Sequence, residues 1–409
     1  MICLKELLTD YGPASIFIGF VHYNLVSIVY NIVPDGYMDE IFHIGQTRRY
    51  CQGNYSWDPM ITTPPGLYVL AIPLFCGRER YLNSLLYPLL FLAACRFRSR
   101  FTRSSLGLSS LSVICLPVLL HSSLLFYTDP LSLLLTLLSF SLPPLPSSFF
   151  FLLSLSVRQT NIGWAFLYAS SVLISSISPS SIIRSSLSVL PTLSPFVLLA
   201  ITFLSFLYIN GGSIVLGDAS AHKPVVHLSQ PLLFVLFSSL HTWPHVLPLL
   251  PSIASHSIRP SSVILIFILP FTLYSFYYTH PYLLADNRHI PFYIHRIVLS
   301  NYFFRLLLSI PILISISFLS FISSSSPRYL RLLFLLSTSI ILVPAHLIEF
   351  RYFITPFAIW RLSIPSPSIF SSLIELFSNL IIFSCVFSLF LFKPFEWPHE
   401  AGVLQRFMW

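Results

Sequence analysis

The chain has 409 residues, of which 55% are apolar and only 9% are charged, and its formal net charge is +8. An ordinary soluble domain carries about 25% charged residues, so the composition excludes that class. The long, repeated apolar runs instead indicate a polytopic helical membrane protein. The positive charge comes almost wholly from arginine and forms no basic face, which argues against nucleic acid and favours membrane lipid or a lipid phosphate as partner.

The first predicted crossing spans residues 13–33, and we interpret it as a retained anchor rather than a cleaved signal. Residues 34–81 follow as a loop, in which residues 66–76 are too short to cross and are expected to form an interfacial or re-entrant helix. The next crossing is predicted over residues 82–95. It ends in an arginine cluster at residues 96–103, which the positive-inside rule places in the cytosol, so the loop before it lies on the non-cytosolic side.

Later crossings are expected to complete an all-α bundle of about 11 to 13 transmembrane helices, in a single domain over residues 1–409. The six cysteines show no metal-ligand spacing, and most lie in or beside apolar runs. We therefore expect neither a metal site nor a disulfide framework. The later crossings are predicted over residues 106–126, 131–145, 149–157, 162–177, 187–209, 232–253, 262–279, 302–322 and 330–346, with one or two more between 352 and 392.

Two adjacent acids in the first outward loop are the best candidates for catalysis. The whole chain has only 14 carboxylates, and four of them lie in the first part of this loop. One of Asp39 and Glu40 is expected to act as general base while the other positions it or caps the turn, and we favour Asp39 as the base. An acidic loop that only keeps the segment out of lipid is the alternative, and the nearby His43, Trp57 and Asp58 argue against it.

Cations in the predicted outward loops are candidates for binding a phosphate. Arg158 ends an apolar run at the membrane surface, where a guanidinium can bind phosphate through two hydrogen bonds. Snorkelling to the lipid headgroups is the alternative, which the neighbouring Gln159 and Asn161 argue against. The cations of His222-Lys223 and Arg288-His289 are interfacial anchors if each is taken singly. Together with Arg158 and Arg351 they can neutralise a leaving phosphate.

Several motifs resemble one family of GT-C membrane glycosyltransferases. They are YMDEIFH at residues 37–43, WDPMITT at residues 57–63 and RQTN at residues 158–161, with further matches at residues 284–289 and 405–409. The family is the endoplasmic-reticulum α-1,2-glucosyltransferase family, which adds the terminal glucose to the lipid-linked oligosaccharide for N-glycosylation. The matches extend over essentially the full length of the chain.

The resemblance implies a GT-C-like bundle in the endoplasmic reticulum membrane, with a lumenal active site and no cofactor or metal. The donor would be dolichyl-phosphate glucose, a β-linked sugar, and the acceptor the diglucosylated lipid-linked oligosaccharide. An α-1,2 bond made from a β-linked donor requires inversion, and hence one carboxylate base. We expect a monomer in which the following residues contact the substrates: His43, Trp57, Asp58, Asp129, Gln159, Asn161 and Asp286.

Two other functions remain open from the residues alone. A sister enzyme that uses dolichyl-phosphate mannose would need the same acids and cations, since they do not identify the sugar. A multi-pass transporter is the alternative of a different class. The charges, however, lie at the ends of predicted crossings rather than in mid-membrane, and no internal repeat is visible. Both observations favour the transferase.

Overall fold

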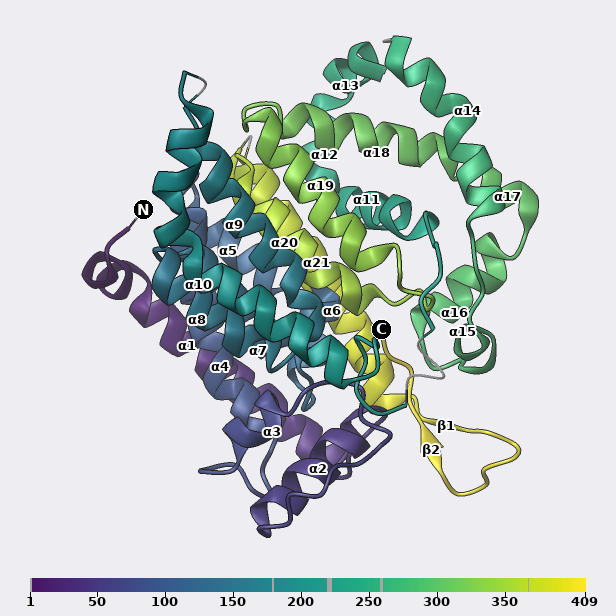
Figure 1. Ribbon diagram of the computed structural model, residues 1–409. Coiled ribbons are helices and arrows are strands. Elements are labelled where there is room, and N and C mark those ends of the chain that lie inside the picture. The colour runs from purple at the N-terminus through teal and green to yellow at the C-terminus, as the bar shows by residue number, and fades with distance from the viewer. Residues whose placement is uncertain (1, 179, 219–222, 258–259, 367) are drawn as a thin grey trace. The chain divides into compact units, whose positions relative to one another are not determined.

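The computed structural model describes residues 2–178, 180–218, 223–257, 260–366 and 368–409 (Figure 1). Regular structure in these residues is overwhelmingly α-helical, as predicted. Two short strands, β1 (Phe395–Glu396) and β2 (Leu404–Gln405), pair antiparallel as a small hairpin near the C-terminal end. The all-α class is therefore confirmed.

Four described helical segments are long and apolar enough to cross a membrane, or up to six if each of two bent helix pairs counts as one span. The chain is thus multi-pass, as predicted. The number of crossings, about 11 to 13, stays a prediction, because many of the remaining apolar helices are shorter than a bilayer is thick. The four segments are α1 (Leu4–Ile32), Tyr302–Ile322, α10 (Ile182–Ile209) and α21 (Ile369–Phe392).

Prolines break two segments that the sequence analysis expected to be continuous. Residues 106–126 form α5 (Leu106–Ile114) and α6 (Pro117–Ser123), whose axes differ by 67°. Residues 232–253 contain a second break of 79°, between α11 (Ser229–His241) and the helical segment Trp243–Ser255. Pro117 and Pro244 lie at these breaks, where the missing N–H and the ring oppose continuation of the preceding helix. The expectation of unbroken crossings was wrong at both places.

The described residues form two compact units. In unit 1, successive helices pack side by side: α1 against α4 (Tyr81–Arg98), α4 against α7 (Asp129–Phe140), and α7 against α8 (Pro144–Leu155) (Figure 1). Helices α9 (Ile162–Ser176) and α10 also pack together and contact α8. Unit 1 comprises Met1–Phe101, Ser122–His222 and Ser326–Ile341, the last holding most of α19 (Arg328–Leu342).

Unit 2 comprises Thr102–His121, Lys223–Ser325 and Leu342–Trp409. Helix α18 (Ser309–Ile322) packs against α11, α13 (Leu250–Ser257), α14 (Pro260–Ser275) and α17 (Tyr302–Leu307), and a small core of Leu269, Leu273 and Ile312 lies between α14 and α18. A buried ion pair between Arg361 and Glu375 joins the helix at residues 354–363 to α21. Unit 2 also contains α5 and α21. Its further described helices include α12 (Trp243–Val246), η3 (Leu247–Leu249), α15 (Pro281–Ala285), α16 (Ile290–Ile294), η4 (His295–Leu299), η5 (Phe350–Phe353) and α20 (Ile354–Ser363).

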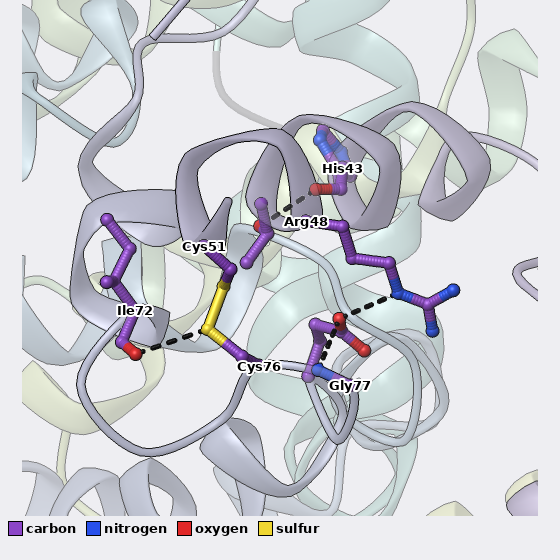
Figure 2. The surroundings of a disulfide bond; sticks show 8 residues. His43, Arg48, Cys51, Ile72, Cys76 and Gly77 are labelled. Atoms are coloured by element: carbon purple, nitrogen blue, oxygen red, sulfur yellow. Dashed lines mark hydrogen bonds and ion pairs between the residues drawn. A yellow bond between two sulfur atoms is a disulfide. The ribbon is translucent and has the colours of Figure 1, made fainter. Parts of the chain in front are cut away.

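The acidic loop, residues 34–81, connects α1 to α4 and contains helices of its own. It contains α2 (Glu40–Cys51) and the short α3 (Gly66–Ala71), and a disulfide between Cys51 and Cys76 joins the end of α2 to the chain beyond α3 (Figure 2). The expectation of no disulfide was wrong for this pair. Both cysteines lie outside the apolar crossings and in the same loop, so their sulfur atoms can meet across a modest stretch of chain.

Candidate active site

The adjacent acids at the start of α2 have different environments. Glu40 is fully buried, and both of its carboxylate oxygens accept hydrogen bonds. Oε1 accepts from Arg80 Nε at 2.6 Å and from the backbone N–H of Phe126 at 2.8 Å. Oε2 accepts from Arg80 Nη2 at 2.7 Å and from the backbone N–H of Tyr37 at 3.1 Å. A carboxylate bound in this way is a structural anchor, whereas Asp39 is only half-buried.

Asp39 lies at the N-cap of α2, and its backbone carbonyl accepts from the N–H groups of Phe42 and His43. The residue before it, Met38, has a φ of 57°, in the left-handed region that residues with a Cβ seldom adopt. Such strain persists only where the surroundings enforce it, and it is common near functional groups. The N-terminal end of a helix also stabilises a negative charge. The turn therefore holds the Asp39 carboxyl group at a defined place, at the N-terminal end of α2.

Aromatic and hydroxyl side chains gather around the next turn of α2. His43 Nδ1 lies 2.7 Å from the Tyr68 hydroxyl, which also lies 3.2 Å from Thr63 Oγ1, and the Trp57 ring is 6.2 Å from the Tyr68 ring. Burial raises the pKa of Tyr68, and the negative charge of Asp39 acts in the same direction. The phenol therefore stays protonated beside the half-buried acid. Of the predicted substrate residues, His43 and Trp57 lie in this cluster.

Asp58 has a local structural role in this loop. Its Oδ1 accepts from the backbone N–H of Met60 at 3.0 Å, and its Oδ2 lies 3.4 Å from Arg49 Nη2. Its own backbone N–H donates to Gln46 Oε1, while Gln46 Nε2 donates to the carbonyl of Ser56. These contacts attach residues 56–60 to α2. The substrate role predicted for Asp58 stays a prediction, and its visible contacts stabilise the loop.

Two glycines allow the loop to lie against other parts of unit 1. The N–H of Gly66 donates to the carbonyl of Ser156 at 2.7 Å, and a Cβ on Gly66 would lie 2.5 Å from Ser156 Oγ. Gly217 has a φ of 62°, and a Cβ there would lie 2.3 Å from the carbonyl oxygen of Pro59. No other residue fits either place without displacing backbone. The close approach at Gly66 brings the threonine pair at residues 62–63 beside Arg158.

Arg158 lies where the chain enters the short helix η1 (Gln159–Asn161). Its Nη2 is 3.0 Å from Asp129 Oδ1, and its Nε donates to Thr128 Oγ1 at 3.0 Å. Asp129 is buried, but 18% of the Arg158 side chain remains exposed. Gln159 Nε2 donates to the carbonyl of Thr62 at 2.9 Å. The structure thus brings Arg158, Gln159 and Asp129 together at the acidic loop.

Asn161 faces the interior instead. It is buried, and its Nδ2 donates to Ser132 Oγ on α7 and to both the carbonyl and the hydroxyl oxygen of Ser154 on α8. These bonds join two helices of unit 1. Both N–H donors of the amide are used by these three protein acceptors, so the contacts favour a structural role for Asn161 over the predicted substrate role.

In unit 2, two predicted site residues are paired with each other. Arg288 Nε and Nη2 donate to the two carboxylate oxygens of Asp286, each at 2.8 Å, and Arg288 Nη1 donates to Gln405 Oε1 at 2.8 Å. The guanidinium also stacks 4.6 Å from the Trp397 ring centre. Burial alone would raise the pKa of Asp286, but the hydrogen bonds from Arg288 and the charge of His289 lower it overall. Asp286 is therefore an ionised partner for Arg288.

The segment at residues 404–409 completes this arrangement. His289 Nδ1 lies 2.6 Å from the carbonyl oxygen of Trp409, and the backbone of Met408 bridges to residues 288–290. The Phe350 ring lies 6.3 Å from the Trp409 ring, beside an ion pair between Arg351 and Glu349. Lys223 is exposed, and His222 lies outside the described residues. The joint action of these cations with Arg158 stays a prediction.

The sequence analysis missed three parts of this region. Arg80 binds Glu40 across 40 residues, Tyr68 links His43 to Thr63, and a disulfide closes the loop. One signal for Arg80 was present, because the acids in residues 34–81 need compensating cations and Arg80 lies in the same loop. The occurrence of two cysteines in one predicted lumenal loop was an equally direct signal for the disulfide.

The comparisons with known proteins agree with these observations. A family model described as the DIE2/ALG10 family matches residues 33–181 and 170–362, which include the acidic loop and Arg158. The chain belongs to this family. The resemblance stated from the motifs is thereby confirmed, and the family match spans both compact units. Within the described residues of this family member, no three His, Cys, Asp or Glu side chains are grouped to hold a metal ion.

Relatives from animals and plants cover nearly the whole chain. A human protein is 32% identical, with 94% of this chain and 95% of the relative aligned. An Arabidopsis thaliana protein is 30% identical over 93% and 96%, and a Drosophila melanogaster protein is 30% identical over 96% and 98%. All three are named Dol-P-Glc:Glc(2)Man(9)GlcNAc(2)-PP-Dol alpha-1,2-glucosyltransferase. No solved structure matches this DIE2/ALG10 family member.

Proposed function

We propose that this protein transfers glucose from dolichyl-phosphate glucose to the diglucosylated lipid-linked oligosaccharide and forms the terminal α-1,2 linkage. The observation that carries the proposal is the shared name of relatives at about 30% identity over nearly the whole chain. Those names specify a glucosyl donor, which favours the glucosyltransferase over the mannosyltransferase alternative. The site geometry is compatible with this reaction, because an acid and an arginine lie in one connected part of unit 1.

Asp39 is the proposed base. It removes the proton from the acceptor 2-hydroxyl as that oxygen attacks the anomeric carbon of the donor glucose. The bond from this carbon to the lipid phosphate breaks, and its electron pair leaves with the phosphate. With a β-linked donor the product is the α-linked sugar. The burial of Glu40 and its four hydrogen bonds favour Asp39 over it as the base, so we assign Glu40 to the framework of the site.

Arg158 is the proposed cation for the leaving phosphate. Part of its side chain is exposed, and its Nη2 lies 3.0 Å from Asp129 Oδ1. A positioned cation in a partly shielded site stabilises the negative charge that develops on the phosphate. Gln159 lies beside it, and we propose Arg288, Arg351, His222 and Lys223 as further contributors.

The sugar contacts are assigned to the aromatic cluster on α2 and α3. Trp57 and Tyr68 offer apolar faces on which a sugar ring can stack, and His43 and Thr63 hydrogen bond to the Tyr68 hydroxyl. The indole N–H of Trp57 is buried and makes no hydrogen bond within the described part of the chain. An unpartnered buried donor on a ring next to Tyr68 suits a sugar hydroxyl as acceptor.

We propose a lumenal active site in the endoplasmic reticulum membrane and a monomeric enzyme that needs no cofactor. The disulfide between Cys51 and Cys76 supports the lumenal assignment of the acidic loop, because disulfides persist in oxidising compartments and are rare in the cytosol. The positive-inside rule leads to the same side from independent evidence.

The test is a transfer assay on membranes that contain the protein as their only source of this activity. Labelled dolichyl-phosphate glucose and dolichyl-phosphate mannose are each supplied with lipid-linked oligosaccharides that carry one, two or three glucoses. We expect transfer of glucose alone, to the diglucosylated acceptor alone, with an α-1,2 linkage in the product. Transfer of mannose, or no transfer by well-folded protein, would overturn the proposal.

A further inference from the structure

Arg80 is a fully buried arginine immediately before α4, and each part of its guanidinium has a partner. Nε and Nη2 donate to the two oxygens of Glu40, Nη1 donates to the carbonyl of Val33 at 2.5 Å, and Nη2 also donates to the carbonyl of Asp35 at 2.7 Å. The ring of Tyr30 covers the guanidinium at 4.8 Å. One side chain thus ties the end of α1, the following loop and the start of α2 together.

Glu40 extends this network to the other side of the site. Besides binding Arg80, it accepts from the backbone N–H of Tyr37, two residues before Asp39, and from that of Phe126. Phe126 lies shortly before Asp129, the residue that orients Arg158. The same carboxylate therefore fixes the turn that carries Asp39 and the segment that leads to Arg158.

A buried ion pair contributes little net free energy to the stability of a protein. Desolvation opposes its formation, and replacing such pairs by apolar residues is often neutral or stabilising. Retention of a pair can instead serve to specify one geometry, as a single buried polar residue does in coiled coils. Arg80 and Glu40 contact four segments of chain around a strained residue, Met38, which is where a specified geometry is needed.

We infer that Arg80 and Glu40 are a positioning pair, which sets the place of Asp39 relative to Arg158. The inference rests on the proposed function, in which Asp39 is the base. Neither residue touches substrate. Each acts by holding the turn at residues 37–40 at one distance from the segment at residues 126–129. A small displacement of a reacting group lowers the rate of the chemical step more than it lowers substrate binding.

The experiment compares Glu40→Gln, Arg80→Met and the double variant Glu40→Gln/Arg80→Met in purified protein. Thermal unfolding, kcat and the KM for dolichyl-phosphate glucose are measured for each. The matched control is the Arg48–Glu79 ion pair of the same loop, at 3.0 Å, changed to Arg48→Met/Glu79→Gln (Figure 2). The control removes an ion pair at the opposite end of α2 and leaves the turn at Asp39 untouched.

We expect each single variant to lose about 100-fold in kcat while the donor KM changes by less than about threefold. The double variant leaves no buried charge without a partner, so its unfolding temperature should recover relative to Arg80→Met. The kcat of the double variant should stay low, because the pair no longer holds the end of α1, the turn at residues 35–40 and the segment at Phe126 together. The control pair should keep its kcat.

Return of kcat to the wild-type value in the double variant would overturn the inference, since the pair would then serve only charge balance. If Arg80→Met does not fold, Glu40→Gln and Arg80→Lys decide the question, because both preserve side-chain volume. Asp39→Asn is assayed in parallel. An active Asp39→Asn enzyme would refute the proposed base, whereas an inactive one beside fully active Glu40 and Arg80 variants would refute only the positioning role.

Discussion

Each arginine proposed to act on the phosphate already has a carboxylate partner. Arg158 pairs with Asp129, Arg288 with Asp286, and Arg351 with Glu349. In the proposed role, a lipid phosphate would share these guanidinium groups with a protein acid. The acid orients the planar fork, and at the same time it reduces the positive potential that the substrate meets. The same pairing would weaken binding of the product phosphate and favour its release.

The identity of the base is tested by changing Asp39. Asp39→Asn keeps the shape of the side chain but removes its ability to take a proton, so turnover should fall at least about 100-fold. Transfer of labelled glucose is measured in purified protein, with Asp35→Asn as control. Asp35 is an exposed acid of the same loop, and its variant should keep near-normal turnover. Near-normal turnover by Asp39→Asn would refute the assignment.

The role of Arg158 is tested by two substitutions of different severity. Arg158→Lys keeps the charge but loses the planar fork, and should reduce kcat/KM for the donor about 10-fold. Arg158→Ala should be worse, by about 100-fold or more, because the developing phosphate charge then has no partner at this place. Both are measured after their unfolding temperatures in detergent are shown to match the wild type. A fully active Arg158→Ala enzyme would mean that the arginine only anchors the lipid headgroups.

The ion pair between Asp286 and Arg288 predicts a pH dependence of stability. The pKa of Asp286 is lower in the folded protein than its ordinary value, so the folded state binds the proton less readily than the unfolded chain. The stabilisation is present at neutral pH and is lost as the pH falls below about 4, toward the folded pKa. Tm should therefore fall less steeply with acidification in Asp286→Asn than in the wild type. Parallel Tm curves from pH 7 to pH 3 would contradict this.

At the residue scale, the sequence predicts a site at the acid pair Asp39–Glu40 and at Arg158, because scarce charges in an apolar chain are informative. It could not separate Asp39 from Glu40. Adjacency along the chain does not say which side chain is buried, and that depends on Arg80, 40 residues away. The pairing of Arg288 with Asp286 was within reach of the sequence, since only one residue separates them.

At the scale of elements, apolar run length located most helices but not their breaks. The predicted crossing at residues 82–95 corresponds to α4, and that at residues 162–177 to α9. The bends at Pro117 and Pro244 were not predicted, because a proline within an apolar run is compatible with either a kinked span or a broken one. Which of the two forms depends on the helices that pack around it.

The disulfide is an element-scale feature with a direct test. Cys51→Ser/Cys76→Ser should unfold at lower temperature, because the bond closes a loop with a sequence separation of 25 residues, worth about 3 kcal/mol in the chain-entropy model. Thermal unfolding in detergent is compared with that of Cys3→Ser, which changes an exposed cysteine outside the bond. Labelling of Cys51 and Cys76 by a maleimide without prior reduction would show that the bond does not form.

At the scale of the whole molecule, the topology is tested with single cysteines at two exposed serines, Ser56 in the acidic loop and Ser104 after the arginine cluster. Ser99 is buried and is unsuitable. The background lacks Cys3 and Cys385. An impermeant maleimide should reach Ser104→Cys from the cytosolic side of sealed microsomes, and Ser56→Cys only after detergent is added. Labelling of both positions from the same side would contradict the lumenal assignment.

The overall class was predictable because composition alone separates a membrane bundle from a soluble domain. The number of crossings was less accessible, since several apolar helices are shorter than a full span and their placement depends on tertiary packing. The sequence pattern does not indicate that the described chain divides into two compact units, because each unit is assembled from segments far apart along the chain.

The pairing of residues 288–290 with Met408 and Trp409 has a consequence for biosynthesis. His289 and Trp409 are separated by 120 residues, so the loop that carries Arg288 cannot reach its final structure until the later segment has been made. At ordinary rates of translation that delay is on the order of ten seconds. During this interval Arg288 lacks its contacts with Gln405 and Trp397. Nascent chains halted before residue 404 should accordingly present this loop to chaperones and proteases, although most of their helices are already inserted.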